Sequence, residues 1–157
     1  MVHTAESSAA PEELFRRVAA LGGKRGWLSW NWAWQIRAVI DRILGGPGLQ
    51  PGRRHPTDLA VDDPVDWWVV EEIRSPERLR LYSRMKLPGE GWLEFRVART
   101  PSGGSKLVQM ALFEPSGLFG RLYWWGLYLP HRIILGGLAG EVVRAAGFEP
   151  ATPSSGD

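Results

Sequence analysis

The sequence contains no cysteine, so any chemistry in this chain must come from other side chains. Disulfides, thiolate metal sites and cysteine nucleophiles are therefore excluded. The histidines His3, His55 and His131 are far apart in the sequence, so we expect no metal site, and no motif calls for a cofactor. His131 directly follows Pro130 in an apolar segment, where an imidazole acting with a carboxylate is an acid/base candidate. A single histidine is more often structural, and no catalytic residue is assigned.

Two further observations on the sequence bear on enzyme activity. The carboxylates that can partner a histidine are Asp66 and Glu94, and either of them can also pair with Arg54 as a buried charge pair. The chain has no Gly-x-Ser-x-Gly nucleophile motif and no glycine-rich nucleotide-binding motif. The sequence therefore leaves open whether the protein is an enzyme.

Polar residues on otherwise apolar strand faces are a more informative signal. In the segment 78–86, apolar residues alternate with Arg and Lys, and Ser83 lies on the apolar face. Gln109 occupies the same kind of position in the segment 105–114, and a buried polar group must find a partner. Strand parity predicts a ligand-binding cavity covered by Tyr123, Leu127 and His131, with a lining formed by Leu81, Ser83, Met85, Leu93, Phe95, Gln109, Ala111 and Phe113. The competing interpretation is that most of these residues simply fill a core.

Tryptophan is unusually frequent, with nine residues in the chain. Trp27, Trp30, Trp32 and Trp34 lie within eight positions, so they cannot all face one core. We expect some of them at a pocket mouth or an interface, and assign Trp34 to the ligand site. A second pair, Trp124-Trp125, is a candidate surface for a homodimer or another partner.

The order of predicted elements indicates an α+β domain. A strand at 2–8 precedes a helix that begins at Pro11, and a second helical pattern covers 33–44. The apolar period then changes to two, which predicts strands near 57–61, 65–73, 78–86, 91–99 and 105–114. Short connections favour an antiparallel meander, and a long helix at 118–145 follows, kinked or divided at Pro130.

Composition and charge limit the remaining classes. A chain of 157 residues with 44% hydrophobic residues is long enough for one domain, which we place at 1–146, followed by a disordered tail at 147–157. The net charge is +2 and the basic residues are scattered, so no nucleic-acid partner is expected. The longest apolar run, 122–131, is too short for a transmembrane segment, and the acidic N-terminal region is unlike a signal peptide. We expect a cytoplasmic protein.

Several local motifs resemble the family known as domain of unknown function 2867, which has a START-like (SRPBCC, helix-grip) fold. The most specific piece is Met85-Lys86-Leu87-Pro88-Gly89 with Trp92-Leu93-Glu94-Phe95. The other matching pieces are Leu21-Gly22-Gly23 with Gly26-Trp27, Trp34 to Asp41, Gly45-Gly46-Pro47-Gly48-Leu49, Gly52-Arg53-Arg54-His55-Pro56, Asp66-Trp67-Trp68-Val69-Val70 and Gly117 to His131.

The resemblance implies a seven-stranded curved antiparallel sheet wrapped around a long C-terminal α-helix, with two short helices after the first strand and a cavity between sheet and helix. It supplies no catalytic residues. We therefore expect binding of a hydrophobic or amphipathic small molecule. One alternative is a cyclase, dehydratase or isomerase that uses His131 with a carboxylate. The other is a module that docks on a separate nucleotide-dependent dehydrogenase, since relatives are often fused to such a domain.

Overall fold

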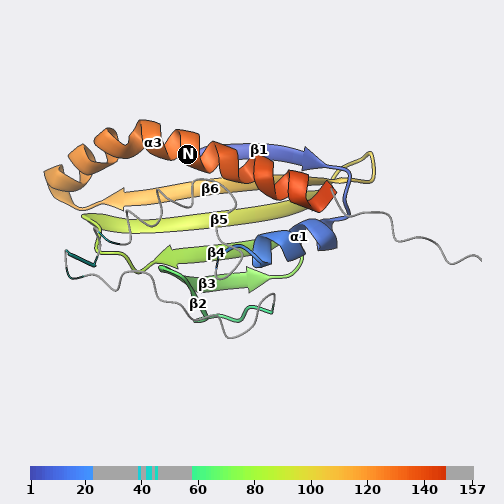
Figure 1. The fold of residues 1–157 in the computed structure, drawn as a ribbon, viewed down its shortest axis with the longest axis horizontal. Helices are drawn as coiled ribbons and strands as arrows, with labels where there is room; N and C mark the ends of the chain where they lie inside the picture. Colours follow the sequence, from blue (N-terminus) through green and yellow to red (C-terminus); the bar gives the residue numbers. More distant parts are fainter. Residues whose placement is uncertain (23–38, 40–41, 44, 46–57, 148–157) are drawn as a thin grey trace, which may run out of the picture.

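The computed structural model describes residues 1–22, 39, 42, 43, 45 and 58–147 of the chain. In these residues six strands form one antiparallel sheet in the order β1-β6-β5-β4-β3-β2, and two helices pack on one face of it (Figure 1). The strands are β1 (Val2–Ser7), β2 (Pro64–Val65), β3 (Trp68–Arg74), β4 (Arg78–Ser83), β5 (Gly89–Arg99) and β6 (Ser105–Pro115), and the helices are α1 (Pro11–Ala19) and α3 (Gly117–Gly147). The predicted α+β class with a long C-terminal helix is confirmed, and the arrangement is consistent with a helix grip.

The meander from β3 to β6 follows the predicted turns, but two details differ. The segment predicted as one strand at 65–73 is divided by a tight turn in which Asp66 has a φ of 58°, so β2 pairs back on β3. The strand predicted at 57–61 is wrong for residues 58–61. There the amide of Ala60 donates a 2.8 Å hydrogen bond to Oδ2 of Asp63, and this local turn replaces strand pairing. The described residues therefore form six strands instead of the seven implied by the resemblance.

Helix α1 forms where its sequence favours a helix start. Pro11 occupies the first turn together with Glu12 and Glu13, where missing N–H groups and negative charges are best tolerated. Its buried residues Leu14 and Val18 pack toward the sheet and α3. The second predicted helix, at 33–44, lies almost entirely outside the described residues. Of the tail predicted at 147–157, Gly147 is the last residue of α3, and residues 148–157 lie outside the described part of the chain.

Helix α3 continues through Pro130 as one element, so a division into two helices is wrong. Pro130 removes one backbone hydrogen bond, but packing holds the helix on both sides of it. Before Pro130, Trp124 stacks on Phe113 of β6 with ring centroids 5.2 Å apart. After Pro130, Leu138 and Val142 are almost completely buried in the core. In the described part of the chain, neither helix has the combined length and apolar character needed to cross a bilayer.

The two faces of the sheet differ in character because side chains alternate along each strand. The inner face, toward the helices, carries the largest buried side chains, among them Leu79, Phe95 and Leu107. The outer face of β3, β4 and β5 carries charges in cross-strand register, with Arg80 opposite Glu72 on one side and Glu94 on the other.

Glu94 is the centre of this charged outer face and only 2% exposed. Its carboxylate oxygens lie 2.5 Å from Nε of Arg96 and 3.1 Å from Nη2 of Arg78, and Nη1 of Arg80 is 3.9 Å away. Burial alone would raise the pKa of Glu94, but hydrogen bonds from Arg96 and Arg78 and their charges hold the pKa below its ordinary value. The ionised carboxylate therefore stabilises the fold.

We predict that Glu94→Gln lowers the free energy of unfolding at neutral pH by about 2 kcal/mol, because it removes the buried carboxylate that Arg78 and Arg96 both contact. A carboxyl with a depressed folded pKa contributes stability above its unfolded pKa and loses it as pH falls through the folded value. The difference between wild type and variant should thus shrink below about pH 4.5. Urea unfolding of wild type and variant at several pH values measures this difference in the free energy of unfolding. Glu71→Gln, at the exposed Arg80 pair, is the control and should cost less than about 1 kcal/mol.

The start of α3 is fixed by a close approach to the β4–β5 connection. A methyl group at Gly120 would overlap the carbonyl oxygen of Pro88, whereas one at Gly126 would meet no atom within 4 Å. We predict that Gly120→Ala lowers the free energy of unfolding by more than about 1 kcal/mol, and that Gly126→Ala raises it by up to about 1 kcal/mol. Thermal unfolding of both variants tests this, and equal effects would contradict the proposed contact.

Candidate functional site

The structure places the apolar members of the predicted lining on the inner face of the sheet. Leu93 and Phe95 of β5 are buried, and both belong to the hydrophobic core with Leu81 of β4. Register puts Leu93 opposite Leu81 and Phe95 opposite Gln109 of β6. The interpretation of these three apolar residues as core is therefore supported by their burial.

Ser83 and Met85 lie where β4 ends. Ser83 is buried, and its Oγ accepts a hydrogen bond of 3.3 Å from the backbone amide of Met85. The Met85 side chain is half-buried and packs against the core. The hydroxyl of Ser83 thus shapes the turn out of β4 as well as facing inward.

Gln109 and His3 form a polar pair on the inner face, at the β1 edge of the sheet. They are directly opposite each other on β6 and β1, and Gln109 is fully buried. The ring of His3 lies against Gly136 of α3, and its buried Nε2 has no hydrogen-bond partner among the described residues. Burial lowers the pKa of His3, and the positive charges of the N-terminus and Arg132 lower it further, so the imidazole is neutral at pH 7.

Sequence reasoning did not select His3, because its partner is more than 100 residues away. The alternation from Val2 to Ser7 was the available signal for its inward direction, but nothing local indicates that β1 pairs with β6. His3 therefore joins the candidate site as a residue that only the fold reveals.

An aromatic group lies farther along β6. Phe113 is half-buried, its ring centroid is 5.8 Å from that of Tyr123, and it stacks on Trp124. Phe113 is opposite Gly91 on β5, where no side chain projects. The structure thus brings two predicted residues, Phe113 and Tyr123, into contact at the start of α3.

Three predicted residues cannot be placed in the same way. Trp34 lies outside the described residues, and only the backbone positions of Leu127 and His131 are described, in the middle of α3. Glu94, a candidate partner of His131, is on the outer face, so the whole sheet separates its carboxylate from α3. Arg54, its other suggested partner, is also outside the described residues.

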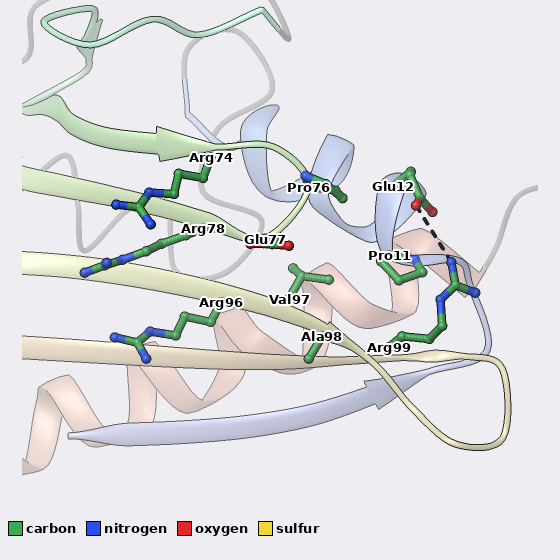
Figure 2. Close-up of a pocket in the computed structure, with 10 residues that line it drawn as sticks. All are labelled: Pro11, Glu12, Arg74, Pro76, Glu77, Arg78, Arg96, Val97, Ala98 and Arg99. Carbon is green, nitrogen blue, oxygen red and sulfur yellow. Dashed lines mark ion pairs between the residues drawn. The ribbon is translucent and has the colours of Figure 1, made fainter.

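Figure 2 shows a surface hollow of about 600 Å³ at the end of the sheet that is farther from the start of α3. The hollow lies between the β3–β4 turn, the start of α1 and the end of β5. Four arginines contribute to its wall. Arg74, Arg78 and Arg96 extend away from the turn along the outer face, while Arg99 is 3.8 Å from Glu12. Arg74 and Arg78 pair with Glu72, and Arg96 pairs with Glu94. Because each guanidinium already has a carboxylate partner, we place the candidate ligand site on the inner face instead.

The inner row of β6 therefore defines the candidate site. Along it follow a buried amide at Gln109, a small side chain at Ala111 and an aromatic ring at Phe113, spaced two residues apart. From the first to the third is about 13 Å along a strand. Polar groups lie at one end and aromatic surface at the other, which is the arrangement that orients an amphipathic molecule.

Comparisons with known proteins identify solved structures that share this fold at low sequence identity. No curated protein matches the sequence at a significant level. Protein NE0264 from Nitrosomonas europaea is 13% identical, with a TM-score of 0.52 over 92% of this chain and 91% of its own. XoxI from Bacillus cereus is 11% identical, with a TM-score of 0.50 over 92% of this chain and 93% of its own.

A weaker match is the HSP90 activator PFC0360w from Plasmodium falciparum, which is 14% identical, with a TM-score of 0.43 over 87% of this chain and 95% of its own. Similarity at these identities concerns architecture and does not extend to activity. The sequence itself carries a stronger relation: the family model described as protein of unknown function (DUF2867) matches residues 2–138, so the chain belongs to that family.

Proposed function

We propose that this protein binds a hydrophobic or amphipathic small molecule between the inner face of the sheet and α3. The observation that supports the proposal best is the row on β6, in which Gln109, Ala111 and Phe113 change from polar to small to aromatic. A ligand lying along this row has its polar group near Gln109 and its apolar part near Phe113.

Burial along the row fits an opening at the aromatic end. Gln109 is completely buried, whereas Ala111, Phe113 and Tyr123 are only half-buried. On the neighbouring strand the side chains become smaller in the same direction, from Phe95 to Gly91. Both gradients point to the start of α3 as the end of the row at which a ligand would enter.

The polar end suits an uncharged ligand group that donates or accepts a hydrogen bond. The neutral imidazole of His3 offers either a donor or an acceptor nitrogen, and Gln109 adds an uncharged amide opposite it. Neither side chain carries a charge at pH 7, so we expect hydroxyl, carbonyl or protonated carboxyl groups to bind there more readily than fixed ions.

The proposal is tested with native mass spectrometry of the purified protein and with a fluorescence titration using 11-(dansylamino)undecanoic acid. We predict saturable binding by the wild type. Ala111→Phe should weaken it by at least about tenfold, because the new ring fills the row between polar and aromatic ends. The neighbouring Leu112→Phe is the matched control, since Leu112 is exposed on the outer face, and it should change affinity less than about twofold.

Thermal unfolding of both variants shows whether each is folded under the titration conditions. Equal affinities of folded Ala111→Phe and Leu112→Phe would contradict the proposed position. A wild type that neither carries a removable mass nor binds the dansyl acid would contradict ligand binding itself.

A further inference from the structure

The first half of α3 carries an exposed apolar stripe, formed by Leu118, Leu122, Trp125, Leu129 and Ile133. These residues recur every three or four positions and so lie on one side of the helix. Each side chain is between 52% and 81% exposed, with Trp125 the most exposed. Isolated exposed apolar residues are ordinary, but a continuous row of this length marks a contact surface.

The opposite side of the same helix segment is attached to the sheet. Trp124 stacks on Phe113, and the close approach of Gly120 to Pro88 fixes the first turn. Figure 1 shows α3 along the outside of the fold. The stripe is thus presented outward by a helix that is already formed, and contact through it requires no unfolding.

The length of the stripe decides how it can meet a lipid bilayer. From Leu118 to Ile133 the helix rises about 22 Å, which is shorter than the hydrocarbon core of about 30 Å. A helix of this kind lies in the plane of the membrane surface, with its apolar side chains at the boundary of headgroups and acyl chains. Exposed Trp and Tyr side chains, here Trp125 and Tyr128, favour that boundary.

The charges beside the stripe favour an anionic surface. Arg121 and Arg132 are both exposed, and they are the only charged residues in the sequence from Gly117 to Gly140. The first acidic residue after the start of the helix is Glu141. The face therefore combines apolar contact with positive charge alone, which is complementary to phosphate headgroups.

The same charges disfavour a second copy of the chain as the occupant. If two stripes packed antiparallel, Arg121 of one copy would lie near Arg132 of the other, and parallel packing would place each arginine beside its own equivalent. Both arrangements bring like charges together at the edge of an apolar contact, with no acidic residue of the segment to compensate them.

We propose that the apolar stripe of α3 binds the surface of an anionic membrane, with the helix lying in the interface and Arg121 and Arg132 contacting phosphate groups. This contact uses the outward side of α3, so it does not depend on the ligand site at the inward side.

The experiment is co-sedimentation of the full chain with vesicles of phosphatidylcholine containing about one quarter phosphatidylglycerol, compared with vesicles of phosphatidylcholine alone. We expect binding to the anionic vesicles that weakens as salt rises. Leu122→Glu combined with Leu129→Glu should lower the partition coefficient at least about tenfold, and Arg121→Gln combined with Arg132→Gln about tenfold at low salt.

The matched control is Val61→Glu combined with Leu112→Glu, which alters two exposed apolar residues away from α3 and should leave partitioning within about twofold of wild type. Thermal unfolding confirms that every variant is folded. Failure of the wild type to bind anionic vesicles at low salt, or equal losses in the α3 and control variants, would overturn the proposal. A dimer in sedimentation velocity that Leu122→Glu with Leu129→Glu abolishes, without vesicle binding, would assign the stripe to self-association instead.

Discussion

Eleven residues of β5 pair without a break with eleven residues of β6, from Gly89 opposite Pro115 to Arg99 opposite Ser105. A shift of one residue in this register would turn every side chain of one strand to the other face. Phe95 would leave the core, and Glu94 would enter it without its arginines. The separation of an apolar inner face from a charged outer face, and with it the position of the proposed ligand-binding row on β6, therefore depends on this pairing.

Much of this arrangement was predictable because it is local. The turns around Gly89 and Gly103, the alternation of the strands and the proline at the start of α1 each act within a few residues. The strands from 78 onward lie close to their predicted bounds, and the inward direction of Leu93, Phe95 and Gln109 follows from parity alone. Families share such patterns, which is why the resemblance to DUF2867 could be seen before the fold.

The features that sequence reasoning missed depend either on contacts between residues far apart in the sequence or on two local preferences that oppose each other. The pairing of His3 with Gln109 joins two strands that are more than 100 residues apart in the sequence, and no short-range pattern predicts it. Residues 58–61 are predicted to form a strand, but the carboxylate of Asp63 accepts a hydrogen bond from the amide of Ala60, and the chain turns there instead. At Pro130 the expected break of the helix is outweighed by packing on both sides. A ligand at the inner row of β6 needs space between the side chains. The alternation of apolar and polar residues along a strand predicts which side chains face inward, but not how completely they fill the space.

The two sides of α3 in its first half serve different environments, and this explains why its sequence is apolar nearly all round. Tyr123 and Trp124 face the sheet, while Leu122 and Trp125 face outward. A soluble surface helix ordinarily pairs one apolar side with one polar side. Here the polar side is reduced to arginines, which is the pattern that the proposed membrane contact of the outward side requires.

The position of β1 at the edge of the sheet has a consequence for the order in which the molecule assembles. Strands β3 to β6 pair with their neighbours in sequence. In contrast, the hydrogen bond from the amino group of Met1 to the carbonyl oxygen of Ala111 joins residues that are 110 positions apart. Contacts of such long range form late in folding, since a large loop must close first. Until β1 arrives, the free edge of β6 offers unpaired backbone groups to any extended segment, including β1 of another molecule. Strand exchange between nascent chains is therefore the misfolding route to which this topology is most exposed.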